Sequence, residues 1–366
     1  MKKVLLTSTA IVAFAGAAAA EVTVTGSAEM GVVGGSDLAT QFFQDVDVKF
    51  TMTGETDGGL SFGASVDLDE AGNLGNEFSN QGVAIFVSGG FGTLTMGDTD
   101  GALDFVLTDA GNIGNPGSIA DDETSHLGYL GSYLDGSGTA DNQVVRYDYS
   151  FGDFAIAVSM EQNPQGDDGF VVDGQEDPDE DDVNYAIGGS YGTEFAGAAV
   201  SVGLGYQHAE NGGPTIADFF AFDDATTGDD LTIAPSGDRV DAIGVGATFT
   251  LDSGFTAGFT YTGFDYEEDA IDDASHVGIG MGYAFDAFSV HFNYGLYNFD
   301  IDGVGDFDVQ GYGIAAGYDL GGGASLLFGY GRSELDADLD SDFDDIADVT
   351  FDDDFDTFSL GLSMAF

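Results

Sequence analysis

Apolar residues alternate with small or polar residues over many stretches of this chain, with a period of two. In residues 277–285, Val, Ile, Met, Tyr and Phe occupy every second position, with Gly or Ala between them. The same alternation runs through residues 45–52, 243–251 and 357–366. Successive side chains of a β-strand point to opposite faces, so each stretch predicts a strand with one apolar face. A soluble sandwich and a membrane barrel both fit this pattern, because the apolar face can meet a second sheet or lipid.

The lengths of the connections favour the barrel. Short turns are expected at residues 56–59, 88–90, 151–153, 192–194, 252–254, 286–287 and 319–323. Longer, acidic connections are expected at about 34–43, 69–80, 98–142, 161–182, 208–237, 266–274, 299–307 and 334–350. Seven turns that alternate with eight loops imply an all-β fold of sixteen antiparallel strands. Tight periplasmic turns and long outer loops are typical of outer-membrane barrels.

Two further features refine this barrel. The predicted strand at 306–319 breaks its alternation at Gln310, where we expect a β-bulge. Aromatic residues lie near the predicted strand ends, where a membrane barrel carries interfacial girdles. Those beside the short turns are Phe91, Phe151, Phe154, Tyr191, Phe255, Phe285, Phe288 and Tyr318. Those toward the long loops are Tyr206, Tyr261, Tyr266, Tyr297 and Tyr330.

The amino terminus predicts export from the cytoplasm. Lys2 and Lys3 precede an apolar stretch at residues 4–14, and three alanines at 18–20 form a small-residue cleavage site. This is the pattern of a secretory signal peptide, and its apolar part is too short to favour a membrane anchor. We therefore expect a signal peptide at residues 1–20 and a barrel domain at residues 21–366.

Composition and charge exclude several classes of protein. The 366 residues include 6 Lys and Arg against 66 Asp and Glu, a net charge of −60, so a nucleic-acid partner is not expected. A hydrophobic content of 43% is too high for a disordered acidic chain, and 58 glycines argue against a mainly helical one. Cysteine is absent, which excludes disulfides and thiolate chemistry. Residues 21–366 keep four cations and all 66 acids. This excess of carboxylates gives the protein a negative electrostatic potential that attracts cations.

Three stretches and the last residue carry a family resemblance. Residues 46–56 (VDVKFTMTGET), 90–97 (GFGTLTMG) and 142–154 (NQVVRYDYSFGDF) resemble the general diffusion porins of Gram-negative bacteria, most closely the alphaproteobacterial, Rhodobacter-type branch. Phe366, preceded by apolar residues at every second position, resembles the signal that the outer-membrane assembly machinery reads. The resemblance implies a homotrimer in the outer membrane and passive diffusion of ions and small hydrophilic solutes, and the excess of carboxylates predicts a preference for cations. It also implies that the third loop, residues 98–142, folds into the lumen.

In this family an acidic third loop faces cations on the barrel wall, and these groups form the constriction. Lys49 matches a wall cation and has lumen parity, although a lumen salt bridge with Asp47 is an alternative. Arg146 also has lumen parity, and it could line the pore or anchor the loop through carboxylates. Gln81 stands where the next wall cation is expected. The loop supplies Asp98, which replaces a basic residue of the family, and Asp100, Asp104, Asp109, Asp121, Asp122 and Glu123.

The two remaining arginines and the acidic loops suggest contacts outside the pore. Arg239 and Arg332 share the parity of lipid-facing residues, so headgroup or subunit contacts are expected. The acidic clusters at 176–182 and 336–356 do not match an EF-hand, because Ser341 and Ala347 occupy two of its key positions. No cofactor is expected, and calcium or another divalent cation could bind diffusely between the loops and lipopolysaccharide phosphates.

Two other functions compete with a channel. Catalysis is disfavoured: His291 shares lumen parity with Ser289 and Asn293, but barrel hydrolases work at the lipid face. The other histidines are His126, His208 and His276, and we expect His276 and His291 to be polar residues of the lumen. An acidic secreted structural or adhesin β-protein without a channel is the alternative. It would give no reason for the terminal Phe366.

Overall fold

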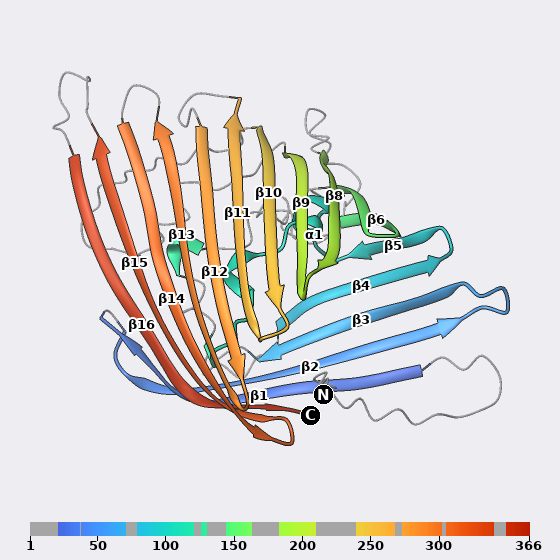
Figure 1. Ribbon diagram of the computed structural model, residues 1–366, viewed down its shortest axis with the longest axis horizontal. Helices are drawn as coiled ribbons and strands as arrows, with labels where there is room; N and C mark the ends of the chain where they lie inside the picture. Colours follow the sequence, from blue (N-terminus) through green and yellow to red (C-terminus); the bar gives the residue numbers. More distant parts are fainter. Residues whose placement is uncertain are drawn as a thin grey trace, which may run out of the picture.

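The computed structural model describes residues 21–36, 38–70, 79–120, 126–129, 144–162, 183–209, 239–267, 273–301, 305–339 and 349–366. Sixteen antiparallel strands of this part form one closed barrel, in which each strand pairs with its neighbours in sequence and β1 pairs with β16 (Figure 1). The expected sixteen-stranded fold is therefore confirmed. Among the described residues, none of the helices is long and apolar enough to cross a membrane. The predicted signal peptide at 1–20 lies outside the described residues.

The strands vary in length, and the shortest is β5. The first eight are β1 (Glu21–Gly35), β2 (Gln41–Glu55), β3 (Ser61–Glu70), β4 (Ser79–Gly89), β5 (Gly92–Gly97), β6 (Val144–Phe151), β7 (Phe154–Gln162) and β8 (Val183–Phe195). The last eight are β9 (Ala198–Ala209), β10 (Val240–Leu251), β11 (Phe255–Tyr266), β12 (Asp273–Phe285), β13 (Phe288–Ile301), β14 (Gly305–Gly321), β15 (Ala324–Leu339) and β16 (Val349–Ala365).

The barrel closes where the two ends of the described chain meet. Ser27 on β1 lies opposite Ala365 on β16, and the register continues without interruption to Gly35 and Thr357. The backbone N–H of Phe366 donates to the Gly26 carbonyl at 2.8 Å. The Phe366 side chain remains exposed on the outside of the barrel. An edge strand would present unpaired backbone groups, and closure removes both edges.

The alternation of side chains places the apolar face outside. On β12, Ile279, Met281 and Tyr283 are exposed, whereas Gly280 and Gly282 between them are buried. A soluble sandwich buries its large apolar residues between two sheets. Here the large apolar residues are on the exposed outer face, and glycines are on the buried inner face. This arrangement is that of a barrel whose outer surface meets lipid.

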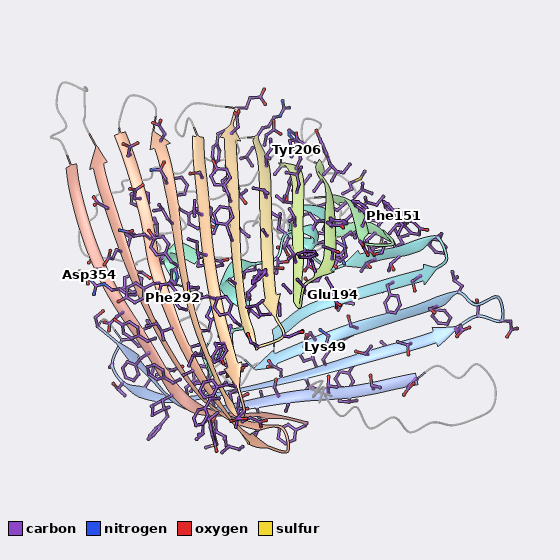
Figure 2. All side chains as sticks on the ribbon, in the orientation of Figure 1. Lys49, Phe151, Glu194, Tyr206, Phe292 and Asp354 are labelled. Atoms are coloured by element: carbon purple, nitrogen blue, oxygen red, sulfur yellow. The ribbon has the colours of Figure 1, made fainter. Side chains whose placement is uncertain are left out.

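Aromatic residues gather at both ends of this apolar band. Phe151, Phe154 and Tyr191 are neighbours at the short-turn end, with ring centroids 5.7 and 4.8 Å apart for successive pairs. Tyr185 and Tyr206 face each other at the long-loop end, with centroids 6.3 Å apart (Figure 2 shows Phe151, Tyr206 and the band residue Phe292). The girdle prediction is wrong for two residues, Tyr266 and Tyr297, because both side chains point inward and are buried.

The two buried tyrosines belong to a reversal of the pattern at the long-loop ends of the strands. On β14, Phe307 and Val309 are fully buried inside the barrel, while Asp306 and Asp308 lie on the outer face. Gln310 is the outward residue at which the reversal begins, and its register with β13 and β15 is continuous. The expected bulge at Gln310 is therefore wrong. The alternation reverses because this part of the strand lies beyond the apolar band. Its outer face is polar and its inner face is apolar, as in a soluble sheet.

The structure corrects the position of one turn and shows a bulge at Gln81. The turn expected at 192–194 lies at Ala196 and Gly197, both of which adopt positive φ angles, of 53° and 83°. Two such residues form the tight hairpin turn that matches strand twist, so β8 runs on to Phe195. A register shift on β3 between Asp67 and Leu68 leaves Gln81 of β4 as the extra, bulged residue.

The connection between β5 and β6, which we call loop 3, enters the barrel. Its described residues form α1 (Ala102–Val106), η1 (Ala110–Asn112) and η2 (Leu127–Tyr129). Helix α1 contacts β7, β8 and β9, η1 contacts β10 to β13, and η2 contacts β13 to β15. Figure 1 shows α1 inside the barrel behind β8 and β9. The described part of loop 3 therefore follows the inner wall and narrows the lumen.

Candidate constriction site

The lumen wall opposite loop 3 is acidic, with one lysine in it. In the closed barrel, β2 lies eight strands from β10, across the lumen from the wall that η1 contacts, although Ile119 of loop 3 reaches Gly31 on β1 and Gly361 on β16. Lys49 on β2 faces inward and its Nζ lies 2.9 Å from Asp67 Oδ2 on β3 (Figure 2 labels Lys49). Asp47 accepts a hydrogen bond from Ser27 instead, at 2.8 Å. Lys49 therefore pairs with Asp67 and not with Asp47, the partner considered from the sequence.

Arg146 on β6 is buried next to the start of loop 3. Its Nη1 donates to the Asp100 carbonyl at 2.7 Å and lies 3.5 Å from Asp100 Oδ2. Its Nε lies 3.7 Å from Asp148 Oδ1, and its guanidinium carbon lies 4.0 Å from the centre of the Phe105 ring. Arg146 thus holds both the backbone and two side chains of loop 3. Of the two roles considered from the sequence, this geometry fits the anchor.

The acids of loop 3 fall into two kinds. Asp98 and Asp100 are exposed and Asp104 is half-buried. Asp109 instead caps η1, since its carboxylate accepts from Gly111 N–H at 2.8 Å and from Asn112 Nδ2 at 2.6 Å. Burial raises the pKa of Asp109, against the hydrogen bonds that lower it. Asp121, Asp122 and Glu123 lie outside the described residues, as does the side chain of Gln81.

The α1 end of loop 3 is held mainly by apolar contacts. Leu103, Val106 and Leu107 are buried. They lie against inward glycines of β8 to β10, and a Cβ on Gly203 would overlap the Val106 carbonyl. The Ala102 N–H adds a directional contact beside those of Arg146, since it donates to Ser159 Oγ at 2.9 Å. Glycine at these wall positions lets the backbone of loop 3 approach the sheet directly.

The other end of loop 3 is held by polar side chains, a role that sequence reasoning missed. Three inward residues of β12 and β13 reach backbone carbonyl oxygens of loop 3. His276 Nε2 lies 3.0 Å from Gly128 O, and His291 Nδ1 lies 3.0 Å from Ile113 O. Asn293 Nδ2 lies 3.5 Å from Gly111 O. Their lumen parity was visible in the sequence, but their partners in loop 3 were not.

Two side chains of loop 3 complete this polar junction. His126 Nε2 lies 3.2 Å from Asn293 Oδ1, and both side chains are buried. Burial is the main cause that lowers the pKa of His126 to about 4, and nearby His276 adds to it. The Tyr129 hydroxyl accepts from Gly111 N–H, and burial together with the Asp109 charge raises its pKa. His126 is therefore neutral at pH 7.

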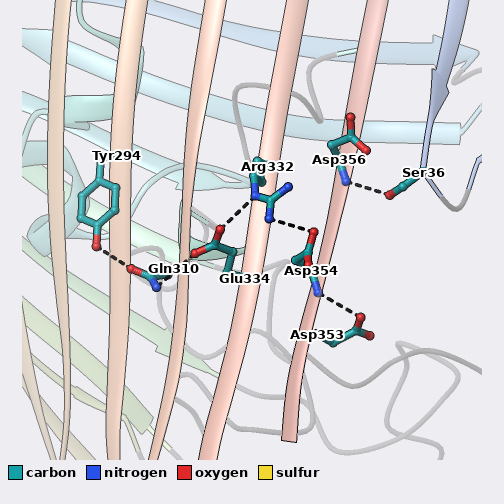
Figure 3. A network of polar contacts seen from close by, with 8 residues as sticks. All are labelled: Ser36, Tyr294, Gln310, Arg332, Glu334, Asp353, Asp354 and Asp356. Atoms are coloured by element: carbon teal, nitrogen blue, oxygen red, sulfur yellow. Dashed lines mark hydrogen bonds and ion pairs between the residues drawn. The ribbon is translucent and has the colours of Figure 1, made fainter.

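Outside the barrel, the two outward arginines pair with carboxylates at the long-loop end. Arg332 Nε lies 2.9 Å from Glu334 Oε1 and its Nη2 lies 2.8 Å from Asp354 Oδ2 (Figure 3). Gln310 donates to Glu334 and accepts from the Tyr294 hydroxyl, which extends the network to β13. Arg239 Nη1 lies 3.2 Å from Glu267 Oε2. Their expected outward parity agrees with the structure.

Taken together, every cation of residues 21–366 has a carboxylate partner, and the channel lining stays acidic. Within the described ranges, no group of three or more His, Asp or Glu side chains has the geometry to hold a metal ion. The acidic cluster at 176–182 and residues 340–348 of the second cluster lie outside those ranges. The described inward residues of β1 to β3 and the exposed Asp98 and Asp100 of loop 3 therefore carry an excess of negative charge.

Comparisons with known proteins agree with this geometry. A family model described as Gram-negative porin matches residues 7–338. A porin of Rhodobacter capsulatus is 34% identical over 322 residues, which cover 86% of this chain and 95% of that protein. A porin structure refined at 1.8 Å resolution is similar in fold, with a TM-score of 0.61, 23% identity, and coverage of 94% of this chain and all of that one. The trimer form of in-vitro folded OmpT from Vibrio cholerae matches with a TM-score of 0.61, 13% identity, and coverage of 95% and 100%.

Proposed function

Because the chain belongs to the Gram-negative porins of the outer membrane, we propose that it is a general diffusion porin whose water-filled channel prefers cations. Small hydrophilic solutes and ions would pass through the lumen without any energy-consuming step. The family and the Rhodobacter relative indicate a channel rather than an enzyme. His291 and Asn293, the residues weighed for catalysis, contact loop 3 instead.

The acidic wall across the lumen from loop 3 carries this proposal. Inward positions of β1 to β3 bring together Glu29, Asp45, Asp47 and Asp67, and Lys49 is the one cation of these strands. The exposed Asp98 and Asp100 of loop 3 add charge of the same sign. Carboxylates that line a narrow passage lower the energy of a cation and raise that of an anion.

Single-channel recording tests the proposal. The purified, folded protein in a planar bilayer should give stepwise currents, and a potassium chloride gradient should give a reversal potential of the sign set by potassium. The preference should weaken at high salt, because screening shortens the range of the wall charges. Folded protein that gives no steps, or steps with chloride selectivity, would contradict the proposal.

A homotrimer is the assembly that the outer surface supports. Strands β1 to β5 and β16 contain no tyrosine, and their outward residues are apolar, such as Val24, Met30, Ile85 and Leu360. A surface that meets lipid carries amphipathic aromatic rings at the interfaces, as the tyrosines on eight of the ten strands β6 to β15 do. We infer that a second copy covers the tyrosine-free sector. One similar structure is described as a trimer form.

This assembly is tested by a pair of matched variants. Met30→Arg on β1 should dissociate the trimer in detergent, because it places a charge in the subunit contact. Leu204→Arg on β9, equally exposed on the outer face, should leave the oligomer intact. Masses measured by light scattering distinguish the two, and dissociation by Leu204→Arg alone would exclude the tyrosine-free sector.

Two further expectations about partners remain proposals. The exposed Phe366, with Met364 and Leu362 on the same outer face, fits a signal for the assembly machinery. The outward acids around Arg332 fit divalent cations that bridge to lipopolysaccharide phosphates. Deletion of Phe366 should reduce insertion in cells, and calorimetry with calcium would test the second expectation.

A further inference from the structure

We propose that His276, His291 and Asn293 are positioning residues that hold loop 3 against the wall and thereby keep the constriction open. The inference rests on the proposed channel function and deepens it. All three side chains occupy inward positions of β12 and β13, and all three are buried beneath loop 3. Each one reaches a different backbone carbonyl, of Gly128, Ile113 and Gly111.

The contacts are directional and define how the loop sits. A carbonyl oxygen only accepts, so His276 must carry its proton on Nε2 and His291 on Nδ1. Asn293 then uses both ends of its amide, donating to Gly111 and accepting from His126. A shift of loop 3 by one residue would break all of these bonds together.

Glycines of the surrounding wall let the backbone of loop 3 come into direct contact with the sheet. A Cβ on Gly280 would overlap the Ala110 carbonyl, and a Cβ on Gly295 would overlap the Gly128 carbonyl. Backbone lies on backbone at these two glycines, while Ile113 packs on Gly258 and Leu127 packs against the buried apolar cluster of the wall. Buried carbonyls that lost their donors would remain unsatisfied, so the loop depends on the three side chains.

The described residues of the junction offer no hydrogen-bond acceptor for an added proton on its histidines. The ring of Tyr297 stacks on His276 at 4.2 Å, and Tyr129 packs edge-on against His276 at 5.3 Å and His126 at 6.0 Å. In the part of the chain that the structure describes, His126 Nδ1 and His291 Nε2 are buried without a hydrogen-bond partner. A proton on either nitrogen would create a buried donor with no acceptor and a charge beside His276. Asp109 is the one described carboxylate next to the junction, and it is engaged with η1 and Tyr129.

Loss of the anchors should obstruct the channel. The described part of loop 3 lies along the inner wall of the closed barrel, so its detachment would move it into the lumen. We expect His276→Leu and Asn293→Leu to show brief closures and roughly tenfold more time in a closed level at pH 7. That is the effect of losing about 1.4 kcal/mol of hydrogen bonding.

Matched variants separate positioning from a general structural effect. His276→Gln keeps an N–H donor at a similar reach, so it should restore the steady open level while removing the acid response that His276 contributes. His208→Gln changes a histidine on the outer face, where His208 Nδ1 lies 2.7 Å from Asp241 Oδ1, and it should behave like wild type. Wild-type channels should develop the same closures between pH 6 and pH 4.

The outcomes are distinguishable. Wild-type protein without channel currents would remove the proposed function. Wild-type currents with folded His276→Leu and Asn293→Leu variants that match them at every pH would overturn the positioning role. Should the leucine variants fail to fold, the triple variant His126→Gln, His276→Gln and His291→Gln decides, because it keeps N–H donors but leaves no imidazole at the junction; closures at pH 4 equal to those of wild type would overturn the proposal.

Discussion

Loop 3 is attached to the barrel wall in two different ways. At α1, Leu103, Val106 and Leu107 bury apolar surface against β8 to β10. At η1 and η2, His276, His291 and Asn293 bond to backbone carbonyls, beside the apolar contacts of Ile113 and Leu127. Apolar burial is strong and non-directional, whereas hydrogen bonds add modest stability and fix position. The first end secures the loop, and the second end sets where it lies.

Removing apolar surface from α1 should give the largest effect. Leu103 is fully buried, so Leu103→Ala should weaken docking of α1 by about 2–5 kcal/mol, through lost burial and a cavity. Hydrogen exchange of residues 101–107 should rise sharply and independently of pH. Leu320→Ala, at an exposed position of the β14 turn, is the control. Equal protection of α1 in wild type and Leu103→Ala would contradict an apolar anchor.

Acid should act on the other end alone. The pKa of His126 in the docked loop is about 4, below its ordinary value of 6.5. Docking is thus fully stable above pH 6.5 and weakens as the pH falls from 6.5 to 4, by about 3 kcal/mol in total. Hydrogen exchange at 110–112 and 127–129, corrected for its intrinsic pH dependence, should reveal this while 101–107 stay protected. Loss of protection at both ends together would mean that the two attachments are not separate.

A methyl group added to an inward glycine of the barrel wall tests how closely loop 3 approaches the sheet. Gly280→Ala would overlap the Ala110 carbonyl, and we expect destabilisation of about 1–3 kcal/mol from overpacking. Gly90→Ala has open space around it and serves as the control. Thermal unfolding followed by circular dichroism measures both. A Gly280→Ala protein as stable as the control would show that η1 does not rest on the wall.

The smallest effect on stability is expected across the lumen, where charge matters for ions more than for folding. The Lys49–Asp67 pair is exposed, so Lys49→Glu should change unfolding by less than about 1 kcal/mol. The reversal potential of the Lys49→Glu channel in a salt gradient should nevertheless shift toward stronger cation preference. Asp67→Asn leaves Lys49 without its partner and should shift the potential the other way. An unchanged potential in both variants would remove this pair from the ion path.

Much of the wall was predictable because β-strand alternation is local. The parity of Lys49, Arg146 and His291 followed from their neighbours alone, and sixteen strands followed from the spacing of turns. The errors arose where context reversed a local pattern. Gln310 suggested a bulge, yet it marks the point where the strand leaves the apolar band. Tyr297 was placed in a girdle by type, yet it points inward.

By itself, the sequence determined the barrel, its inner and outer faces and the acidity of its lining, because each depends on neighbours along one strand. Only the tertiary structure decided how loop 3 meets the wall. His126 and Asn293 are 167 positions apart, and His276 and Gly128 are 148 apart. No periodicity couples such distant residues. Their contact depends on where the closed barrel and the path of the loop bring them, and these are properties of the whole fold.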